Sequence, residues 1–210
     1  MVTKGERTRQ RILDLAGPIF NARGYHTATL AEVMAATGLE KGGIYNHFGS
    51  KEDLALAAYD RNAELLGDLI RAAVRSRRGA VDRLVAFLAA YRRFAHDPLF
   101  PGGCPTLNTA VESHGSDPRL QERAREVMRS LLEGTVGRIV RRGIERGELR
   151  PGTDPDAVAS VVIAGIEGAL LLQQLFDDVR HVDRVLDHLE AYVTTLAVSP
   201  GGERETEEET

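Results

Sequence analysis

The sequence predicts an all-α protein of about nine helices, in which a small three-helix head precedes a larger helical domain. Apolar residues recur at spacings of three and four along most of the chain, without the strict alternation typical of half-buried strands. Glycine, proline and polar clusters interrupt this pattern at regular intervals and indicate where helices end. The expected helices cover residues 4–23, 29–36, 40–48, 51–76, 80–96, 106–113, 118–147, 155–178 and 182–197.

Length and composition are those of an ordinary globular protein that can bury a sizeable core. The chain has 210 residues, 42% of them hydrophobic, and Cys104 is its single cysteine, so an intramolecular disulfide is impossible. The N-terminus lacks the apolar stretch of a secretory signal. The longest apolar candidate, residues 158–172, is shorter than the roughly 20 residues of a spanning helix. We therefore expect a cytoplasmic protein without a membrane partner.

The net charge of −4 is unevenly distributed. Residues 1–51 hold seven basic and four acidic side chains, 7 − 4 = +3, whereas residues 199–210 hold one arginine and five glutamates, 1 − 5 = −4. Phosphate binding depends on the local field and not on the sum, so the N-terminal region is a candidate for binding nucleic acid. We expect residues 199–210 to form a disordered acidic tail.

The first expected helix, residues 4–23, places Ile12, Ala16 and Phe20 on one apolar face. Proline inside a helix removes one backbone hydrogen bond, so the Gly17-Pro18 pair predicts a bend without a break. Gly24 is expected to end this helix.

Two short helices follow, joined by the three-residue turn at residues 37–39. Thr29 and Glu32 have the spacing of a capping box at the start of the first short helix. The apolar residues that would pack the two helices together are Leu30, Val33, Met34, Leu39, Ile44 and Phe48. Such a pair forms a helix-turn-helix, whose second helix can present its outer face to a DNA major groove. Ser50 and Asp53 then cap the long helix over residues 51–76.

In this region the sequence resembles the DNA-binding signature of the TetR family of transcriptional regulators. More than a dozen positions match in order and without gaps, whereas the rest of the chain resembles the family only in the number and length of its helices. The matching positions are 24–30, Val33, Ala36, Gly38, Leu39, Lys41, Gly42, 44–48 and 50–54.

Eight residues are predicted to contact DNA: Thr29, Lys41, Gly42, Gly43, Tyr45, Asn46, His47 and Lys51. Thr29, at a helix N-terminus, can offer its hydroxyl and backbone N–H to a phosphate. Lys51 is a cation in the first turn of a helix, an unfavourable position unless an anion lies nearby. Lys41 and Asn46 are suited to reading base edges.

Gly42 and Gly43 lower helix propensity, which is easier to explain by close approach of the backbone to DNA than by stability. The resemblance implies that Tyr45 and His47 contact phosphates. An alternative is that Tyr45 is a half-buried packing residue. Basic residues of the first helix could either meet the DNA backbone or form a solvated face, and these are Arg7, Arg9 and Arg11.

We divide the chain into a helix-turn-helix domain at residues 1–50, an effector-binding and dimerisation domain at 51–198 and the tail at 199–210. The last two expected helices carry apolar stripes, formed by Val158, Val161, Val162, Ile166, Ala169, Leu170 and Gln173 and by Val182, Val185, Leu186, Leu189, Val193 and Leu196. The resemblance implies that these helices pair in a homodimer, which would select a palindromic operator. The alternative is that the stripes close the core of one chain.

The resemblance also implies a small-molecule effector bound between the head and the dimer helices. The candidate residues are Phe87, Tyr91, Phe94, Cys104, Leu107, Asn108, Val111, Glu112, Met128 and Gln173. Each of them is also explained as an ordinary core residue. Cys104, close to a helix start, could have a lowered pKa and sense oxidants or electrophiles, or be a small buried thiol.

The expected function is that of a dimeric repressor that a small molecule releases from double-stranded operator DNA. Sensing of oxidants or electrophiles through Cys104, and activation instead of repression, remain alternatives. An architectural DNA binder would leave the larger domain unexplained except as a dimeriser. An enzyme is not expected, because no base–nucleophile spacing, phosphate loop or zinc motif occurs. We expect no cofactor and no metal site.

Overall fold

A computed structural model describes residues 3–198 and confirms the all-α class. The helices are α1 (Lys4–Arg23), α2 (Leu30–Thr37), α3 (Lys41–Tyr45), α4 (Lys51–Arg75), α5 (Ala80–His96), α6 (Pro105–Glu112), α7 (Pro118–Leu131), η1 (Leu132–Gly137), α8 (Arg138–Glu145), α9 (Pro155–Phe176) and α10 (Arg180–Thr194). Because α7, η1 and α8 follow without a break, the described residues contain nine continuous helical segments, as predicted. The predicted acidic tail lies outside the described residues.

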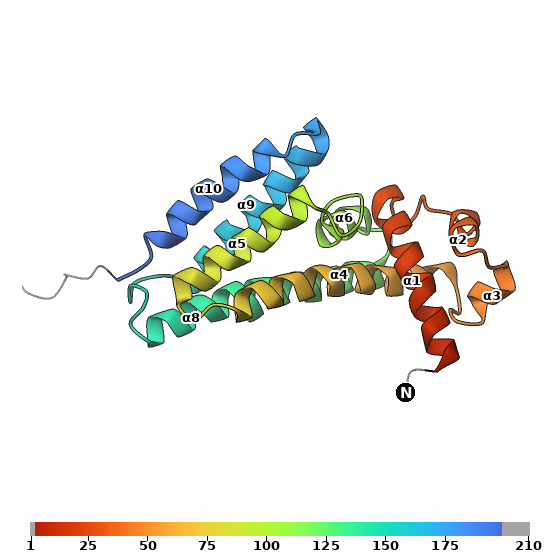
Figure 1. Ribbon diagram of the computed structural model, residues 1–210, viewed down its shortest axis with the longest axis horizontal. Helices are drawn as coiled ribbons and strands as arrows, with labels where there is room; N and C mark the ends of the chain where they lie inside the picture. The colour runs from red at the N-terminus through yellow and green to blue at the C-terminus, as the bar shows by residue number, and fades with distance from the viewer. Residues whose placement is uncertain (1–2, 199–210) are drawn as a thin grey trace, which may run out of the picture.

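Helices α1, α2 and α3 form a head at one end of an elongated molecule, and α4 to α10 form the body (Figure 1). α4 packs against α1 of the head and against α5 of the body, so one long helix joins the two parts. α5 packs in turn against α10, and α10 packs against α9. α6 lies where the head meets the body (Figure 1).

Two hydrophobic cores hold this arrangement together. The core of the head contains Val33, Ile44 and Phe48, all buried as the helix-turn-helix pattern predicted, and it extends to α7 through Leu120 and Ala124. The body has its own core, to which α4, α5, α9 and α10 all contribute. α1 continues through Pro18, and it is tied to α4 where the buried Asn62 amide donates to the Gly17 carbonyl oxygen at 2.9 Å.

The second helix of the helix-turn-helix is shorter than predicted. α3 ends at Tyr45, and residues 46–47 form a turn, whereas the prediction extended the helix to residue 48. The His47 N–H donates to the Ile44 carbonyl oxygen at 2.9 Å, an i→i−3 bond that tightens the chain at the end of the helix. Two adjacent glycines within five residues also weaken the helix.

A π-helical turn, η1, interrupts the long segment that was predicted as one regular helix over residues 118–147. Gly137 closes this turn, and a Cβ atom there would lie 2.9 Å from the Leu132 carbonyl oxygen. The wide turn therefore depends on glycine at this position. Hydrophobic spacing alone does not distinguish a π turn from an α-helix, which is why the sequence prediction missed it.

By length and composition alone, α9 is long and apolar enough to span a membrane. Its 22 residues exceed the segment of 15 residues at 158–172 considered in the sequence. The helix packs against α10, η1, α8 and α5, and residues such as Val162 and Ile166 are buried there. This packing fits the sequence interpretation of a buried or interface helix.

Candidate nucleic-acid interface and effector cavity

The start of α2 is fixed by the predicted capping box. The Glu32 N–H donates to the Thr29 hydroxyl oxygen at 3.2 Å, and the Thr29 N–H donates to the Glu32 carboxylate at 2.8 Å. These hydrogen bonds hold the pKa of Glu32 below its ordinary value. The two groups of Thr29 that were predicted to meet a phosphate are thus occupied by Glu32, and a phosphate would have to replace that carboxylate.

On α3, Ile44 faces the core and the remaining side chains are available to a partner. Lys41 and Asn46 are exposed, Tyr45 is 36% exposed, and the Lys41 ammonium lies 5.7 Å from the centre of the Tyr45 ring. A Cβ atom on Gly42 would have no neighbour within 4 Å. Packing within this chain therefore does not require glycine there, which leaves close approach of a partner as the explanation.

Lys51 has a structural partner that the sequence did not reveal. Its ammonium donates to the His26 carbonyl oxygen at 2.9 Å, and this bond ties the start of α4 to the loop between α1 and α2. The lysine ammonium has three N–H donors, so two remain for a phosphate. His47, another of the predicted contact residues, is partly buried in the turn after α3.

One basic residue of α1, Arg9, lies beside this surface. The Arg9 guanidinium lies 4.9 Å from the centre of the Phe48 ring, next to the end of α3. Within residues 3–198, the side chains of Arg7, Arg9 and Arg11 form no ion pair. Their charges are therefore not neutralised by a neighbouring acid and add to a positive field around α3.

The head and the body meet at a joint that sequence reasoning assigned to effector binding. The Glu112 carboxylate, at the end of α6, accepts hydrogen bonds from the backbone N–H groups of Tyr25 at 2.9 Å and His26 at 2.8 Å. Gly24 has a φ of 92°, and a Cβ atom there would lie 2.9 Å from a Glu112 oxygen. The positive φ favours glycine, and the Glu112 carboxylate occupies the space that a side chain at position 24 would need. The contact with Glu112 therefore depends on glycine in this loop.

A second contact completes the joint. The Asn21 amide donates to the carbonyl oxygens of Pro101 at 2.7 Å and Gly103 at 3.0 Å, and the Asn108 amide donates to the Gly102 carbonyl oxygen at 2.5 Å. A Cβ atom on Gly102 would lie only 2.5 Å from the Asn21 carbonyl oxygen. Asn108 and Glu112 thus hold the end of α1 against the loop before α6, and neither lines the main cavity.

The other predicted effector residues do not gather around one space. Phe87, Phe94 and Cys104 are buried in the core of the body, with Leu107 packed against it. Val111 is 71% exposed, and Met128 lines a separate shallow groove along α7. Gln173 donates to the Ala95 carbonyl oxygen at 3.0 Å. Tyr91 is the one predicted effector residue that lines the main cavity.

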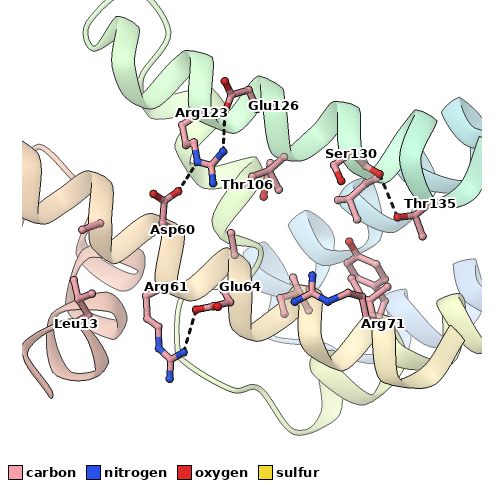
Figure 2. Close-up of a pocket in the computed structure, with 18 of the residues that line it drawn as sticks. Leu13, Asp60, Arg61, Glu64, Arg71, Thr106, Arg123, Glu126, Ser130 and Thr135 are labelled. Atoms are coloured by element: carbon pink, nitrogen blue, oxygen red, sulfur yellow. Dashed lines mark hydrogen bonds and ion pairs between the residues drawn. The ribbon is translucent and has the colours of Figure 1, made fainter. Parts of the chain in front are cut away.

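That cavity has a volume of about 580 Å³ and lies between α4 and α7, a size typical of ligand pockets (Figure 2). α4 provides one wall, α7 and η1 provide another, and α1, α5 and α6 contribute further lining residues. The lining residues include Leu13, Leu66, Ile70, Tyr91, Thr106 and Arg123. The apolar spacing of α4 and α7 did not reveal this cavity. Such spacing predicts which face of a helix is buried, but it does not predict how closely two buried faces pack.

Cys104 is not an activated thiol. Burial, followed by the neighbouring Glu167 carboxyl, raises the pKa of Cys104 well above its ordinary value, so of the two alternatives that of a lowered pKa is wrong. The thiol donates to a Glu167 oxygen at 3.2 Å. Burial also raises the pKa of Glu167 to about 7. Cys104 is thus the small buried thiol of the alternative interpretation.

One face of α9 is apolar and has no partner among the described residues. The predicted dimer residues Val158, Val162 and Ile166 are buried inside the body, as are most of those on α10, and these close the core of one chain, whereas Val161 of the predicted α9 set is 49% exposed. Four of the eight exposed large hydrophobic side chains among residues 3–198 lie on α9. We define the α9 stripe as the exposed positions Ala157, Val161, Ala164, Gly168, Leu171 and Leu175.

Comparison with known proteins identifies both parts of the chain. Residues 12–58 match the family model for bacterial regulatory proteins of the tetR family, and residues 80–189 match that for the tetracyclin repressor-like C-terminal domain. Across 88% of this chain and 90% of the relative, the sequence is 26% identical to the HTH-type transcriptional repressor AcnR of Corynebacterium diphtheriae.

Two solved structures are similar over nearly their whole length. A TetR transcriptional regulator from Chloroflexus aurantiacus is 42% identical, with a TM-score of 0.88 and coverage of 92% of this chain and 98% of that one. A regulator of the same family from Cytophaga hutchinsonii is 32% identical, with a TM-score of 0.87 and coverage of 95% and 99%.

Proposed function

Because the chain belongs to the TetR family, and is therefore a DNA-binding transcriptional regulator and not an enzyme, we propose that it is a dimeric repressor that leaves a palindromic operator when a small molecule binds. The observation that carries this proposal is the outer face of α3. Its side chains are exposed, its glycines are not required by packing among the described residues, and Arg9 of α1, which forms no ion pair there, lies beside it. Acting on operator DNA places the protein in the cytoplasm.

In the bound state, Lys41 and Asn46 read base edges in the major groove. Tyr45, His47 and Lys51 contact phosphates, and Gly42 and Gly43 bring the backbone close to the DNA. Thr29 contributes its hydroxyl and N–H after Glu32 turns away. Arg9 is proposed as a further phosphate contact, because its guanidinium lies at the end of α3. The similarity to a curated repressor supports repression over activation.

A second copy of the chain is the proposed partner of the α9 stripe. The stripe is apolar, and its small residues allow two helices to approach closely; a Cβ atom on Gly168 would have no neighbour within 4 Å in this chain. Twofold pairing through α9 and α10 would place two heads on the two halves of a palindrome.

Release depends on α4, which links the cavity to the DNA-binding surface. Residues 57–71 of α4 line the cavity, and Lys51 begins the same helix. A ligand that separates α4 from α7 would change the position of the heads in both chains. Such coupling requires that the ligand bind the released state more tightly than the operator-bound state.

The test is a titration of the purified chain against DNA from upstream of its own reading frame, with an inverted repeat intact or scrambled. The expected result is preference for the intact repeat, with an affinity that falls by about three orders of magnitude between 50 and 200 mM salt, since several phosphates are contacted. Equal binding to both fragments, or binding insensitive to salt, would contradict the proposal.

A further inference from the structure

The inner end of the main cavity, defined here by the buried residues Tyr91 and Thr106, holds a hydroxyl that has no partner among the described residues. Tyr91 lines the cavity, is fully buried, and its hydroxyl has no hydrogen bond within the described chain. The hydroxyl of Thr106, also buried at this end, lies 3.4 Å from that of Tyr59. Buried hydroxyls are nearly always hydrogen-bonded in proteins, so the isolated Tyr91 hydroxyl indicates a group that is supplied from outside the chain.

Between this inner end and the solvent the cavity has apolar walls. Leu13, Leu66 and Ile70 are buried, and Val127 and Leu131 are partly buried. These side chains come from α1, α4 and α7, so they surround the space from several sides. A molecule that reaches Tyr91 therefore needs a hydrocarbon body.

None of the charged residues that line the cavity is buried; Arg71 pairs with Asp68, and Arg9 forms no ion pair among the described residues. The Arg123 guanidinium contacts Asp60 at 2.6 Å and Glu126 at 2.7 Å, and Arg61 contacts Glu64 at 3.2 Å (Figure 2). None of the buried lining residues is a lysine, arginine or histidine. An anion beside Tyr91 would therefore find no buried cation among the lining residues.

The groups near Tyr91 also disfavour an anion. Burial raises the pKa of Tyr91 well above its ordinary value, and the neighbouring Cys104 and Glu167 raise it further. The hydroxyl therefore stays protonated and can donate a hydrogen bond. When Glu167 is ionised, its charge repels any second negative charge placed beside Tyr91.

We propose that the cavity binds an uncharged amphipathic molecule whose hydroxyl or carbonyl oxygen accepts a hydrogen bond from Tyr91. Its hydrocarbon body lies against Leu66 and Ile70, and its outer end can be polar. This inference rests on the proposed function, because it names the chemistry of the effector. Since Tyr91 is fully buried in the ligand-free form, the polar group reaches it only when α4 and α7 separate, which links occupancy to the position of α4.

The test compares octan-1-ol, octan-2-one and octanoate as probes of the full chain at pH 7.5. Calorimetric melting and titration are suitable readouts, because the chain contains no tryptophan. The alcohol and the ketone are expected to raise Tm in a saturable manner, and octanoate at the same concentrations is not. Tyr91→Phe is expected to weaken the Kd for octan-1-ol about fivefold, as loss of one neutral hydrogen bond does.

Tyr25→Phe is the matched control. The Tyr25 hydroxyl is also buried without a partner, but Tyr25 does not line the cavity. Both variants are expected to raise the Tm of the ligand-free protein, and only Tyr91→Phe to weaken octan-1-ol binding. Octanoate binding as tightly as octan-1-ol, an unchanged Kd in Tyr91→Phe, or no saturable binding of the alcohol and ketone would each overturn the inference. Loss of operator binding in wild type would instead contradict the proposed function.

Discussion

Replacing Glu112 with alanine is expected to loosen the joint between the head and the body. The carboxylate accepts two hydrogen bonds, from the Tyr25 and His26 N–H groups at 2.9 and 2.8 Å. A hydrogen bond to a charged group contributes about 1.5–3 kcal/mol, and Glu112 is only partly buried, so solvent reduces each contribution. We expect Glu112→Ala to lower the free energy of unfolding by about 2 kcal/mol, and Glu112→Gln by about 1 kcal/mol.

Calorimetric melting checks the magnitude, since about 2 kcal/mol corresponds to a fall in Tm of about 4–8 °C for a chain of this size. Hydrogen exchange checks the place, because the amides of Tyr25 and His26 lose their acceptor and should exchange faster. Glu122→Ala is the control: Glu122 is an exposed carboxylate on α7 whose ion-pair partner is Arg125, one turn away. If Glu112→Ala has the same Tm as Glu122→Ala, and the amides of Tyr25 and His26 remain protected from exchange, the carboxylate does not hold the joint.

Three further predictions concern DNA binding, assembly and pH. Lys51→Ala should weaken binding to all DNA sequences alike and lower the salt slope by about one, whereas Asn46→Ala should also relax base preference. Gel-shift titrations on operator and scrambled DNA distinguish the two variants. Unchanged DNA binding by Lys51→Ala would refute the phosphate role of Lys51. Leu171→Glu, at a position that is 53% exposed in one chain, should yield folded monomers in light scattering, and a persistent dimer would exclude the α9 stripe as the interface. Burial raises the pKa of Glu167 to about 7, above its unfolded value, so the stabilisation of the folded state that is present below pH 4.5 is lost as pH rises to 7. Glu167→Gln should abolish up to about 3 kcal/mol of that loss. If the Tm of both proteins changes equally between pH 5 and 8, the prediction is wrong.

The sequence predicted what depends on residues close together in the chain. The capping box of Thr29 and Glu32 needs a spacing of three, and the burial of Val33 and Ile44 follows from helical periodicity. The bounds of α1 and α5 follow from Gly24 and from flanking polar residues. The DNA-contact roles of the eight residues around α3 stay predictions, because they depend on a partner.

Contacts between residues that are distant in the chain could not be predicted from the sequence. Glu112 and its backbone donors are 86 and 87 positions apart, and nothing local indicates that a carboxylate closing α6 would hold the loop after α1. α9 is apolar on nearly every side, so its pattern does not show that Val162 is buried while Val161 is exposed. The cavity depends on gaps between side chains of five helices, which no periodicity describes.

The π turn gives one continuous helix two different tasks. Leu120 and Ala124, before it, are buried in the core of the head, whereas Ile139 and Val140, after it, are buried in the core of the body, against which Met128 and Leu131 at the end of α7 also pack. One residue added to an α-helix rotates everything downstream by about 100°. Deleting a single residue from η1 would therefore turn Ile139 and Val140 away from the body while Leu120 stayed in place. This stretch is thus constrained in length as well as in composition, because its residue count sets the angle between the buried residues of α7 and those of α8.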